Sequence, residues 1–515
     1  LPRVKKFEKK YNQEKIDKYI QSIEAELEEL DYNDPKDKRK IVSREQKISN
    51  IKAGIFTTKK EQELIRPINL GSSVDLPALM YSEEGFHFEV IKNNESGKPS
   101  TDEETLTNLR LTVKKPDSPK AIFLDRLLEL RGLEKMYKTY IEGWNEKVQD
   151  DDRLHGRFLI HGTTSGRLSS AEPNAQQIPK TSVDPNIKLQ LKAPKGTLYI
   201  ASDFSQAELR IMAHLSGDET YLNAFNSGQD PHLAIAATKY HIPYEEALKI
   251  YEDENHPEHK IWKVRRKQAK QIAFGLIYGI GAKLLAVKLS DPKSGIIVTP
   301  EEAQKEMDIF FGQHPKLKTF LKKQEKFLRK NGHLVSLFGR KRRLPQIYSN
   351  DKGEEAYALR LALNFPCQSA ASDMCLFGSI LIYYLMRQGK LPSTKSVCLV
   401  HDANYQITKP ENINIWSIYE MWQIYRNPLT KPYFGFQIDD VTMDMEFVIG
   451  RSMAEELPFI PGYDYKKMLE PDFSVEEYME EHKKYKHIPI SEYKKRFNKQ
   501  MKQYEKDFER THGME

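Results

Sequence analysis

Two short apolar runs, far apart in the sequence, each lead to an aspartate. Residues 198–202 directly precede Asp203, and residues 397–400 end two positions before Asp402, so the aspartates lie 199 positions apart (402 − 203 = 199). Apolar runs of this length predict β-strands. Residues 404–408 continue the second run as a hairpin, which places Asp402 at an exposed tip. The fold must therefore hold two carboxylates at strand ends, which are rigid positions that stay open to a ligand.

The two aspartates are candidate ligands for divalent metal ions. Phosphoryl transfer with two such ions needs oxygen ligands that hold the ions roughly 3.5–4 Å apart. Carboxylates are hard ligands that suit Mg²⁺, so Asp203 and Asp402 qualify. For either aspartate alone, a turn or helix-capping role is the ordinary interpretation. Their occurrence together with the patterns below favours the metal site.

Four residues spaced by four indicate an anion-binding helix. Arg266, Lys270, Phe274 and Tyr278 share one face, because each step of four residues turns only about 40° beyond a full turn. Arg266 and Phe274 are separated by roughly 12 Å along such a helix, about the reach from a terminal phosphate to a sugar. The cations come first, towards the N-terminal end where the helix dipole favours anions. An ordinary amphipathic helix remains the alternative for this spacing alone.

Two glycines fall within the same pattern, at Gly275 and Gly279. A glycine inside a helix costs roughly 1 kcal/mol relative to alanine. We therefore expect a close approach of another group, or a bend, at these positions.

Two further segments are rich in groups that could contact a nucleic acid. The first, residues 166–177, holds a dense polar set: Arg167, Ser169, Ser170, Asn174, Gln176 and Gln177. Such side chains can bond to minor-groove acceptors and to phosphates whatever the base sequence. The second segment, residues 339–343, reads as a basic turn. A plain surface loop and a solvated turn are the alternatives for the two segments.

Composition permits these interpretations without deciding between them. The 515 residues are enough for about three to four domains, and 39% hydrophobic residues are ample for packed cores. With 80 Lys and Arg against 74 Asp and Glu, the net charge of +6 allows a nucleic-acid partner but does not require one. Cys367, Cys375 and Cys398 lack metal-ligand spacing and suit a reducing compartment. No apolar run reaches the roughly 18–20 residues of a membrane span.

The chain divides into helical and mixed segments. Residues 1 to about 150 predict one helical module, in which the helical spacing is set by Ile16, Tyr19, Ile20, Ile23, Leu27 and Leu30. Residues 216 to about 365 predict a second helical module, with one helix starting at Pro300 before two glutamates. Beyond about residue 455 the chain is rich in Lys, Glu and Tyr, without a pattern that names a chemistry.

At this point the motifs resemble those of family A, the DNA polymerase I-like DNA polymerases. Residues 165–179 resemble the primer-template binding motif of that family, and residues 203–210 resemble its motif A. Residues 266–279 are similar to motif B on the mobile fingers helix, and residues 400–402 to motif C. A weaker likeness extends from about residue 69 to residue 452. The order and combination of these motifs are highly specific.

Carried over position by position, the resemblance implies three sets of site residues. The catalytic set is Asp203, Asp402 and Lys270, with the two aspartates as the metal ligands. The nucleotide-binding set, in which the first two grip the triphosphate, is Arg266, Lys270, Phe274, Tyr278, Glu208, Gln206 and His232. The DNA-binding set is Arg167, Asn174, Gln176, Arg360, Asn364, Gln368 and His401.

The resemblance also implies individual roles. Lys270 would protonate the leaving pyrophosphate. Phe274 would pack against the incoming sugar. Some relatives have tyrosine at this position, and phenylalanine there implies discrimination against nucleotides that lack the 3′-hydroxyl. Tyr278 would stack near the templating base, and Glu208 would fill the space of a ribose 2′-hydroxyl. His401 would lie near the primer end.

Several features depart from the family pattern. Ala403 stands where the family usually has a glutamate, so the third carboxylate of motif C is missing. Ala273 replaces a usual asparagine, and Lys267 a frequent second arginine. The expected thumb starts almost at the first residue, which leaves no room for the proofreading exonuclease that often precedes it. The tail from about residue 455 extends beyond the usual end of the family.

The resemblance implies an α+β fold, a right-hand polymerase with a helical thumb, an antiparallel-sheet palm and mostly helical fingers. The expected divisions are a thumb at 1–154, palm segments at 155–215 and 369–454, fingers at 216–368, and a C-terminal extension joined to the palm at 455–515.

The expected function is template-directed DNA polymerisation by two-metal-ion nucleotidyl transfer with release of pyrophosphate. The expected cofactor is Mg²⁺, as two ions for which Mn²⁺ can substitute. The expected partners are primer-template DNA and deoxynucleoside triphosphates, with no membrane. We expect a monomer in the cytoplasm, in bacterial or viral replication, and an organellar location stays open.

Two other functional classes remain to be weighed. A single-subunit RNA polymerase shares parts of the architecture, but Glu208 argues against it because a site for ribose should avoid that bulk. A catalytically dead DNA-binding scaffold is disfavoured by the presence of Asp203, Lys270 and Asp402, although Ala403 leaves it some room. Copying of RNA templates stays open.

Overall fold

The protein forms two compact units in a computed structural model. The structure describes residues 2–94, 96–181, 184–290, 297–426, 430–485 and 490–512. The N-terminal unit comprises Leu1–Lys138 with Ser290–Ile297, and the C-terminal unit comprises Thr139–Leu289 with Val298–Glu515.

The N-terminal unit is helical, as the sequence predicts. Its helices are α1 (Pro2–Glu28), α2 (Pro35–Lys52), α3 (Lys59–Gln62), α4 (Asp75–Tyr81), α5 (Glu103–Thr112) and α6 (Pro119–Met136), and the π-helix η1 (Tyr137–Glu142) continues the chain. Ile20 and Ile23 on α1 pack with Ile51 on α2 in a small apolar cluster, which confirms the predicted helical spacing. Because α1 ends at Glu28, Leu30 lies beyond the helix that its spacing suggested.

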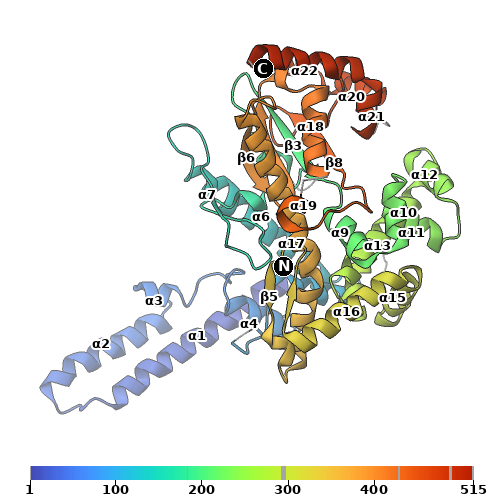
Figure 1. Ribbon diagram of the computed structural model, residues 1–515. Coiled ribbons are helices and arrows are strands. Elements are labelled where there is room, and N and C mark those ends of the chain that lie inside the picture. The colour runs from blue at the N-terminus through green and yellow to red at the C-terminus, as the bar shows by residue number, and fades with distance from the viewer. Residues whose placement is uncertain are drawn as a thin grey trace. The chain divides into compact units, whose positions relative to one another are not determined.

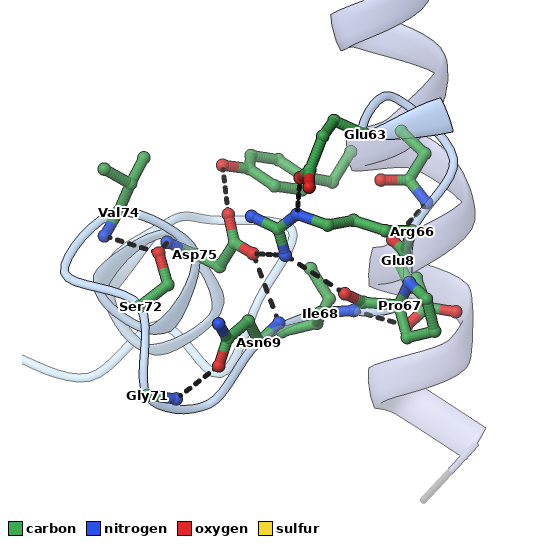
Figure 2. A network of polar contacts seen from close by, with 12 residues as sticks. Glu8, Glu63, Arg66, Pro67, Ile68, Asn69, Gly71, Ser72, Val74 and Asp75 are labelled. Carbon is green, nitrogen blue, oxygen red and sulfur yellow. Dashed lines mark hydrogen bonds and ion pairs between the residues drawn. The ribbon is translucent and has the colours of Figure 1, made fainter. Parts of the chain in front are cut away.

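A polar network fastens α1 to the segment that follows α3 (Figure 2). The carboxylate of Asp75, only 2% exposed, accepts hydrogen bonds from Arg66 Nη1 at 2.5 Å and from the amide of Asn69 at 3.2 Å. Tyr11 on α1 donates its hydroxyl to the same carboxylate at 3.3 Å. Glu8, one turn earlier, accepts from the amide of Ile68 at 2.8 Å. This loop is therefore tied to α1 by charged side chains as well as by apolar packing.

The C-terminal unit is built around an antiparallel sheet of five strands in the order β6–β7–β3–β8–β9. Its strands are β3 (Leu198–Phe204), β6 (Lys395–Val400), β7 (Ala403–Thr408), β8 (Met445–Gly450) and β9 (Leu457–Pro458). The predicted strands at 198–203, 397–400 and 404–408 are thus confirmed. Strands β6 and β7 form the predicted hairpin, whose turn is His401–Asp402. Alternate side chains of β3 face the core, so the intervening ones, including Asp203, lie on the opposite face.

Figure 1 labels many of the helices and strands of this unit, of which some lie beside the sheet and others form a separate group. The helices are α7 (Gly143–Asn145), α8 (Pro185–Gln190), α9 (Ala207–Ser216), α10 (Glu219–Asn226), α11 (Pro231–Lys239), α12 (Tyr244–Glu252), α13 (His259–Ile277), α14 (Ala282–Leu289), α15 (Pro300–Gln313), α16 (Pro315–Asn331), α17 (Lys352–Arg387), α18 (Ile415–Arg426), α19 (Lys431–Phe434), α20 (Val475–Lys483), α21 (Ile490–Arg496) and α22 (Asn498–His512). Short hairpins pair β1 (Arg157–Leu159) with β2 (Ser169–Ala171) and β4 (His333–Val335) with β5 (Lys341–Arg343). The 3₁₀ helices are η2 (Ala175–Gln177), η4 (Pro345–Tyr348), η5 (Pro410–Asn412) and η6 (Tyr465–Leu469).

Local signals account for several of these boundaries. Helix α15 begins at Pro300 as predicted, because Thr299 and Glu302 form a reciprocal capping box. The predicted basic turn at 339–343 is corrected in part. The turn itself spans residues 336–340, and Lys341–Arg343 is strand β5.

Helix α17 is the one described helix with the length and apolar composition of a membrane span. It carries Pro366 within its 36 residues. Phe365, Cys367 and Ala370 are fully buried, so this helix supplies core to the C-terminal unit. Its apolarity is explained by that packing.

The described residues of the C-terminal extension, 455–485 and 490–512, belong to the same core. Tyr465, Tyr478, Tyr493 and Met501 are buried in the cluster that also contains the sheet residues. The ring centroids of Phe508 on α22 and Trp416 on α18 lie 4.9 Å apart. The extension therefore packs against the helix that covers the sheet.

Candidate nucleotidyl-transfer site

Of the two predicted metal ligands, Asp203 lies on strand β3, and Asp402 lies in the turn directly before the neighbouring strand β7. Asp203 is paired in register with Ala403, the residue directly after Asp402. Asp402 occupies the two-residue turn between β6 and β7, in which His401 has a left-handed backbone with φ of 57°. The predicted hairpin is confirmed, but the prediction that Asp402 is exposed at its tip is wrong, because Asp402 is half-buried and His401 is the exposed residue.

A third carboxylate, missed by the sequence analysis, lies across β3. Glu446 on β8 is paired with Asp203 on the side away from Ala403. Residues directly opposite each other in an antiparallel pair project to the same face. Glu446 therefore shares the open face of the sheet with Asp203, while its neighbours Met445 and Phe447 face the core. The alternation of apolar and polar residues around Glu446 could have been seen in the sequence. The sequence does not show that β8 pairs with β3, and only that pairing places Glu446 beside Asp203.

The environment of Asp203 disfavours its negative charge. The side chain keeps contact with solvent, yet the protein atoms packed around it raise its pKa to about 7. Negative charge on Asp402, Glu446 and Glu456 acts in the same direction. A bound cation would relieve this repulsion, which is the electrostatic property expected of a metal site.

Asp203 and Asp402 fit Mg²⁺ as part of its ligand shell. Asp203 and Asp402 offer hard oxygen ligands, as Mg²⁺ prefers, and Mg²⁺ usually completes its shell with water and substrate phosphates. Within the described ranges, no group of three or more His, Cys, Asp or Glu side chains is arranged to hold an ion. Ala403 is consistent with that finding, because its methyl group takes the place of a ligand.

Helix α13 carries the predicted row of cations and aromatics. Arg266, Lys270 and Phe274 lie on one partly exposed face, and Tyr278 follows as the C-cap. The Lys270 ammonium is 5.8 Å from the centre of the Phe274 ring, whose centroid is 5.9 Å from that of Tyr278. The four side chains therefore form the expected line. The helix starts at His259, so Arg266 lies in its second turn, where the dipole of the N-terminus contributes little, contrary to the prediction.

The two glycines have separate structural reasons. A Cβ on Gly275 would stand 2.5 Å from Ile280 Cδ1, so a close approach explains this residue, as predicted. Gly279 is not inside the helix. It follows the C-cap with φ of 68°, a conformation that favours glycine at helix ends.

His232 and Asp230 lie beside Arg266. Asp230 is the N-cap of α11 and accepts from Arg266 Nε at 3.0 Å and Nη2 at 2.5 Å. His232, in the first turn of α11, is 1% exposed, and neither ring nitrogen has a hydrogen-bond partner among the described residues. Burial lowers its pKa to about 4, and Arg266 and Lys270 act in the same direction. Two buried nitrogens without partners at a cationic surface suit a ligand.

Glu208 connects the strand that carries Asp203 to α13. It lies in the first turn of α9, accepts from Arg167 Nη2 at 2.5 Å, and accepts the hydroxyl hydrogen of Tyr278. Burial and the charge of Glu208 hold the pKa of Tyr278 well above its usual value. Gln206, with φ of 57°, has a buried side-chain oxygen that accepts no hydrogen bond from the part of the chain that the structure describes. Four predicted site residues are thus close together. Arg167, Glu208 and Tyr278 form one hydrogen-bond network, and Gln206 lies two positions before Glu208 in the chain.

The predicted DNA-contacting residues come from three places in the C-terminal unit. Asn174 caps η2, and Gln176 donates its side-chain amide to the carbonyl of Leu399 on β6 at 2.9 Å. On α17, Arg360, Asn364 and Gln368 follow one another at four-residue intervals. Arg360 is exposed, the other two are half-buried, and the side-chain oxygen of Asn364 is buried with no hydrogen-bond partner within the described ranges. Contacts of these residues with DNA stay a prediction.

A model of DNA polymerase family A matches residues 38–415 of this sequence. The chain belongs to that family. The family A resemblance drawn from the motifs is therefore confirmed. The thermostable DNA polymerase I of Thermus aquaticus is 32% identical over 319 residues, which cover 62% of this chain and 35% of the relative. DNA polymerase I of Pseudomonas aeruginosa is 32% identical over 336 residues, 65% of this chain and 33% of the relative.

A solved family A structure matches the fold. The polymerase domain of Pol1 from M. smegmatis, in a complex with DNA primer-template and dNTP, has a TM-score of 0.61 at 28% identity. The match covers 76% of this chain and 62% of that one. The predicted α+β fold of helices with an antiparallel sheet is thereby confirmed. The chain spans about a third of the length of the curated family A relatives that it matches.

Proposed function

We propose that the chain is a template-directed DNA polymerase that adds deoxynucleotides to a primer 3′ end and releases pyrophosphate. The hydrogen bond from Tyr278 to Glu208 carries the proposal. It joins the helix that presents Arg266 and Lys270 to the helix that directly follows Asp203. Cations for a triphosphate and carboxylates for metal ions thus belong to one connected site.

The residues of the site would divide the work as follows. Divalent ions held by Asp203 and Asp402 would lower the pKa of the primer hydroxyl and neutralise charge on the leaving phosphates. Arg266 and Lys270 would bind the triphosphate, and the ammonium of Lys270 would give a proton to the departing pyrophosphate oxygen. Phe274 would pack on the sugar. Two ions of Mg²⁺, replaceable by Mn²⁺, are the proposed cofactor.

Sugar and DNA recognition follow from the same network. Glu208, held by Arg167 and Tyr278, has a fixed position from which it would exclude a ribose 2′-hydroxyl. The polar side chains of η2 and α17 would line the primer-template minor groove. We keep the division into thumb (1–154), palm (155–215 and 369–454), fingers (216–368) and C-terminal extension (455–515) as a proposal, together with a monomeric, cytoplasmic protein.

Primer extension tests this proposal directly. The native chain should extend a labelled primer on a DNA template with Mg²⁺ and deoxynucleotides, and much less with ribonucleotides. Asp402→Asn should abolish extension, whereas Asp472→Asn, an exposed aspartate of the extension, should not. A native chain that binds primer-template and extends nothing would support the scaffold alternative, with Ala403 as the first residue to restore to glutamate.

A further inference from the structure

Arg266 has a carboxylate partner that the sequence motifs do not include. Its Nε and Nη2 both donate to one oxygen of Asp230, at 3.0 and 2.5 Å. The other oxygen of Asp230 accepts from the amide of Leu233 at 2.8 Å, so the carboxylate is anchored as the N-cap of α11. One rigid acid thus links the start of α11 to the side of α13.

This arrangement occupies one edge of the guanidinium and leaves the other edge free. Arginine has five N–H donors in a planar fork, of which Asp230 takes one from Nε and one from Nη2. The three remaining hydrogens lie on Nη1 and Nη2, the pair that binds a phosphate in bidentate fashion. The guanidinium carbon also lies 5.5 Å from the centre of the Tyr251 ring. Arg266 is therefore held in one orientation before any ligand binds.

The support for Asp230 itself extends to a second element. Its backbone amide donates to the hydroxyl of Tyr244 at 2.9 Å, at the start of α12. The Arg266 guanidinium helps to hold the pKa of Asp230 below its usual value, against the effect of burial, so the carboxylate stays charged at neutral pH. Asp230 and Arg266 have about a quarter of their side-chain surface exposed, which leaves the pair within reach of a bound anion.

Lys270 provides a contrast on the same helix face. Within the described residues it has no carboxylate partner, and its side chain is exposed. A lysine ammonium acts as a point charge without a preferred plane, whereas arginine binds by orientation. An orienting acid is thus useful beside Arg266 and unnecessary beside Lys270.

We propose that Asp230 is a positioning residue that orients Arg266 so that its free edge binds the phosphates of the incoming nucleotide. The inference rests on the proposed function and adds a residue to it. Asp230 does not touch substrate in this scheme. It acts through Arg266, and its removal should weaken binding of polyphosphates while DNA binding stays unchanged.

Asp230→Asn separates this role from helix capping, because asparagine caps helices about as well as aspartate. Binding is measured on a primer-template whose primer lacks a 3′-hydroxyl, with the complementary deoxynucleoside triphosphate and separately with inorganic pyrophosphate. We expect both affinities to fall about tenfold, the lower end of the effect found when a partner that orients a metal-binding side chain is lost. Primer-template affinity and the unfolding temperature should match the native chain.

Three further variants complete the test. Asp351→Asn, which changes the N-cap of α17 where no arginine is bound, should leave nucleotide affinity unchanged. Asp230→Glu should recover part of the loss. In an Arg266→Ala background, Asp230→Asn should add nothing, because the group that it orients is gone.

The outcomes distinguish the inference from the function on which it rests. A native chain that fails to bind the complementary triphosphate would overturn the proposed function itself. A native chain that binds it, with Asp230→Asn equal to native or tighter, would overturn only the positioning role and would make Asp230 a cap or a competitor for Arg266. Equal losses in the presence and absence of Arg266 would also contradict the role.

Discussion

At the scale of single residues, Glu208 is held more firmly than a surface glutamate. Two donors from different segments, Arg167 and Tyr278, fix its carboxylate. A side chain with so little freedom can exclude a substituent by size alone, and removal of its bulk should matter more than removal of its charge.

Substitution of Glu208 tests that reasoning. Glu208→Ala should raise kcat/KM for ribonucleotides relative to deoxynucleotides by roughly ten- to hundredfold, the range of discrimination that a change in pocket size provides. Glu208→Gln keeps the bulk and should retain most of the selection. Single-nucleotide incorporation with each sugar gives the ratio. Unchanged selection in the alanine variant, or equal loss in both variants, would remove the steric role.

The raised pKa of Asp203 has a consequence for stability. Its value of about 7 in the folded protein exceeds the ordinary value of 3.8, so the folded state disfavours the charged form. Without divalent ions, this cost is fully present above about pH 7 and disappears as the pH falls towards 4.

Asp203→Asn should therefore stabilise the metal-free protein. In EDTA at pH 8 we expect its unfolding temperature to rise by about 1–3 °C, discounted because the side chain is partly in contact with water. The gain should shrink as the pH falls through 7 towards 5. Differential scanning fluorimetry at several pH values gives the result, with Asp472→Asn as the control. A gain that is independent of pH would contradict the assigned cause.

At the scale of elements, the sequence predicts what local spacing determines. The strand before Asp203, the hairpin around Asp402 and the helix of Arg266, Lys270 and Phe274 were all predictable, because apolar runs and four-residue steps are local properties. Glu446 and Asp230 were not. Glu446 becomes part of the site only because strand β8 pairs with β3, which carries Asp203. Asp230 does so only because it accepts a hydrogen bond from Arg266 on a different helix.

The polar network of α1 in the N-terminal unit is another element-scale feature that no motif indicated. Asp75 is buried, and its pKa is lowered, although burial alone would raise it, because the amide of Asn69 and the charge of Arg66 stabilise the carboxylate. A group whose folded pKa is below its unfolded value of 3.8 stabilises the fold above that value, and the stabilisation is lost as the pH falls below it.

Asp75→Asn should therefore destabilise the N-terminal unit by about 3 kcal/mol at pH 7, because Arg66 would lose its buried partner. Glu84→Gln, which breaks an exposed pair with Lys10, should change the stability of this unit much less, because water and salt screen an exposed ion pair. Urea unfolding monitored by proteolysis within residues 2–138 resolves this unit from the other. The difference between Asp75→Asn and native should narrow below about pH 4, and similar costs for the two variants would contradict the burial argument.

At the scale of the whole molecule, the C-terminal extension is part of the structural core of the C-terminal unit. Tyr478 on α20 is 1% exposed and donates its hydroxyl to the carbonyl of Pro458 on edge strand β9 at 2.7 Å. Its ring meets that of Tyr463 edge-on, with centroids 4.9 Å apart. The extension thus holds the edge of the same sheet that carries Asp203.

Tyr478→Ala should consequently act at a distance from the site. We expect a loss of about 3–5 kcal/mol in the stability of the C-terminal unit, as for other large buried aromatic residues, and an earlier thermal loss of primer extension. Tyr478→Phe, which removes only the hydroxyl, should cost about 1 kcal/mol. Tyr504→Ala, at a half-exposed position of α22, should lower the stability less than either substitution of Tyr478. If Tyr478→Ala left the unfolding of this unit unchanged, the extension would be a separate appendage, and its contacts with β9 would contribute nothing to the sheet on which the proposed chemistry depends.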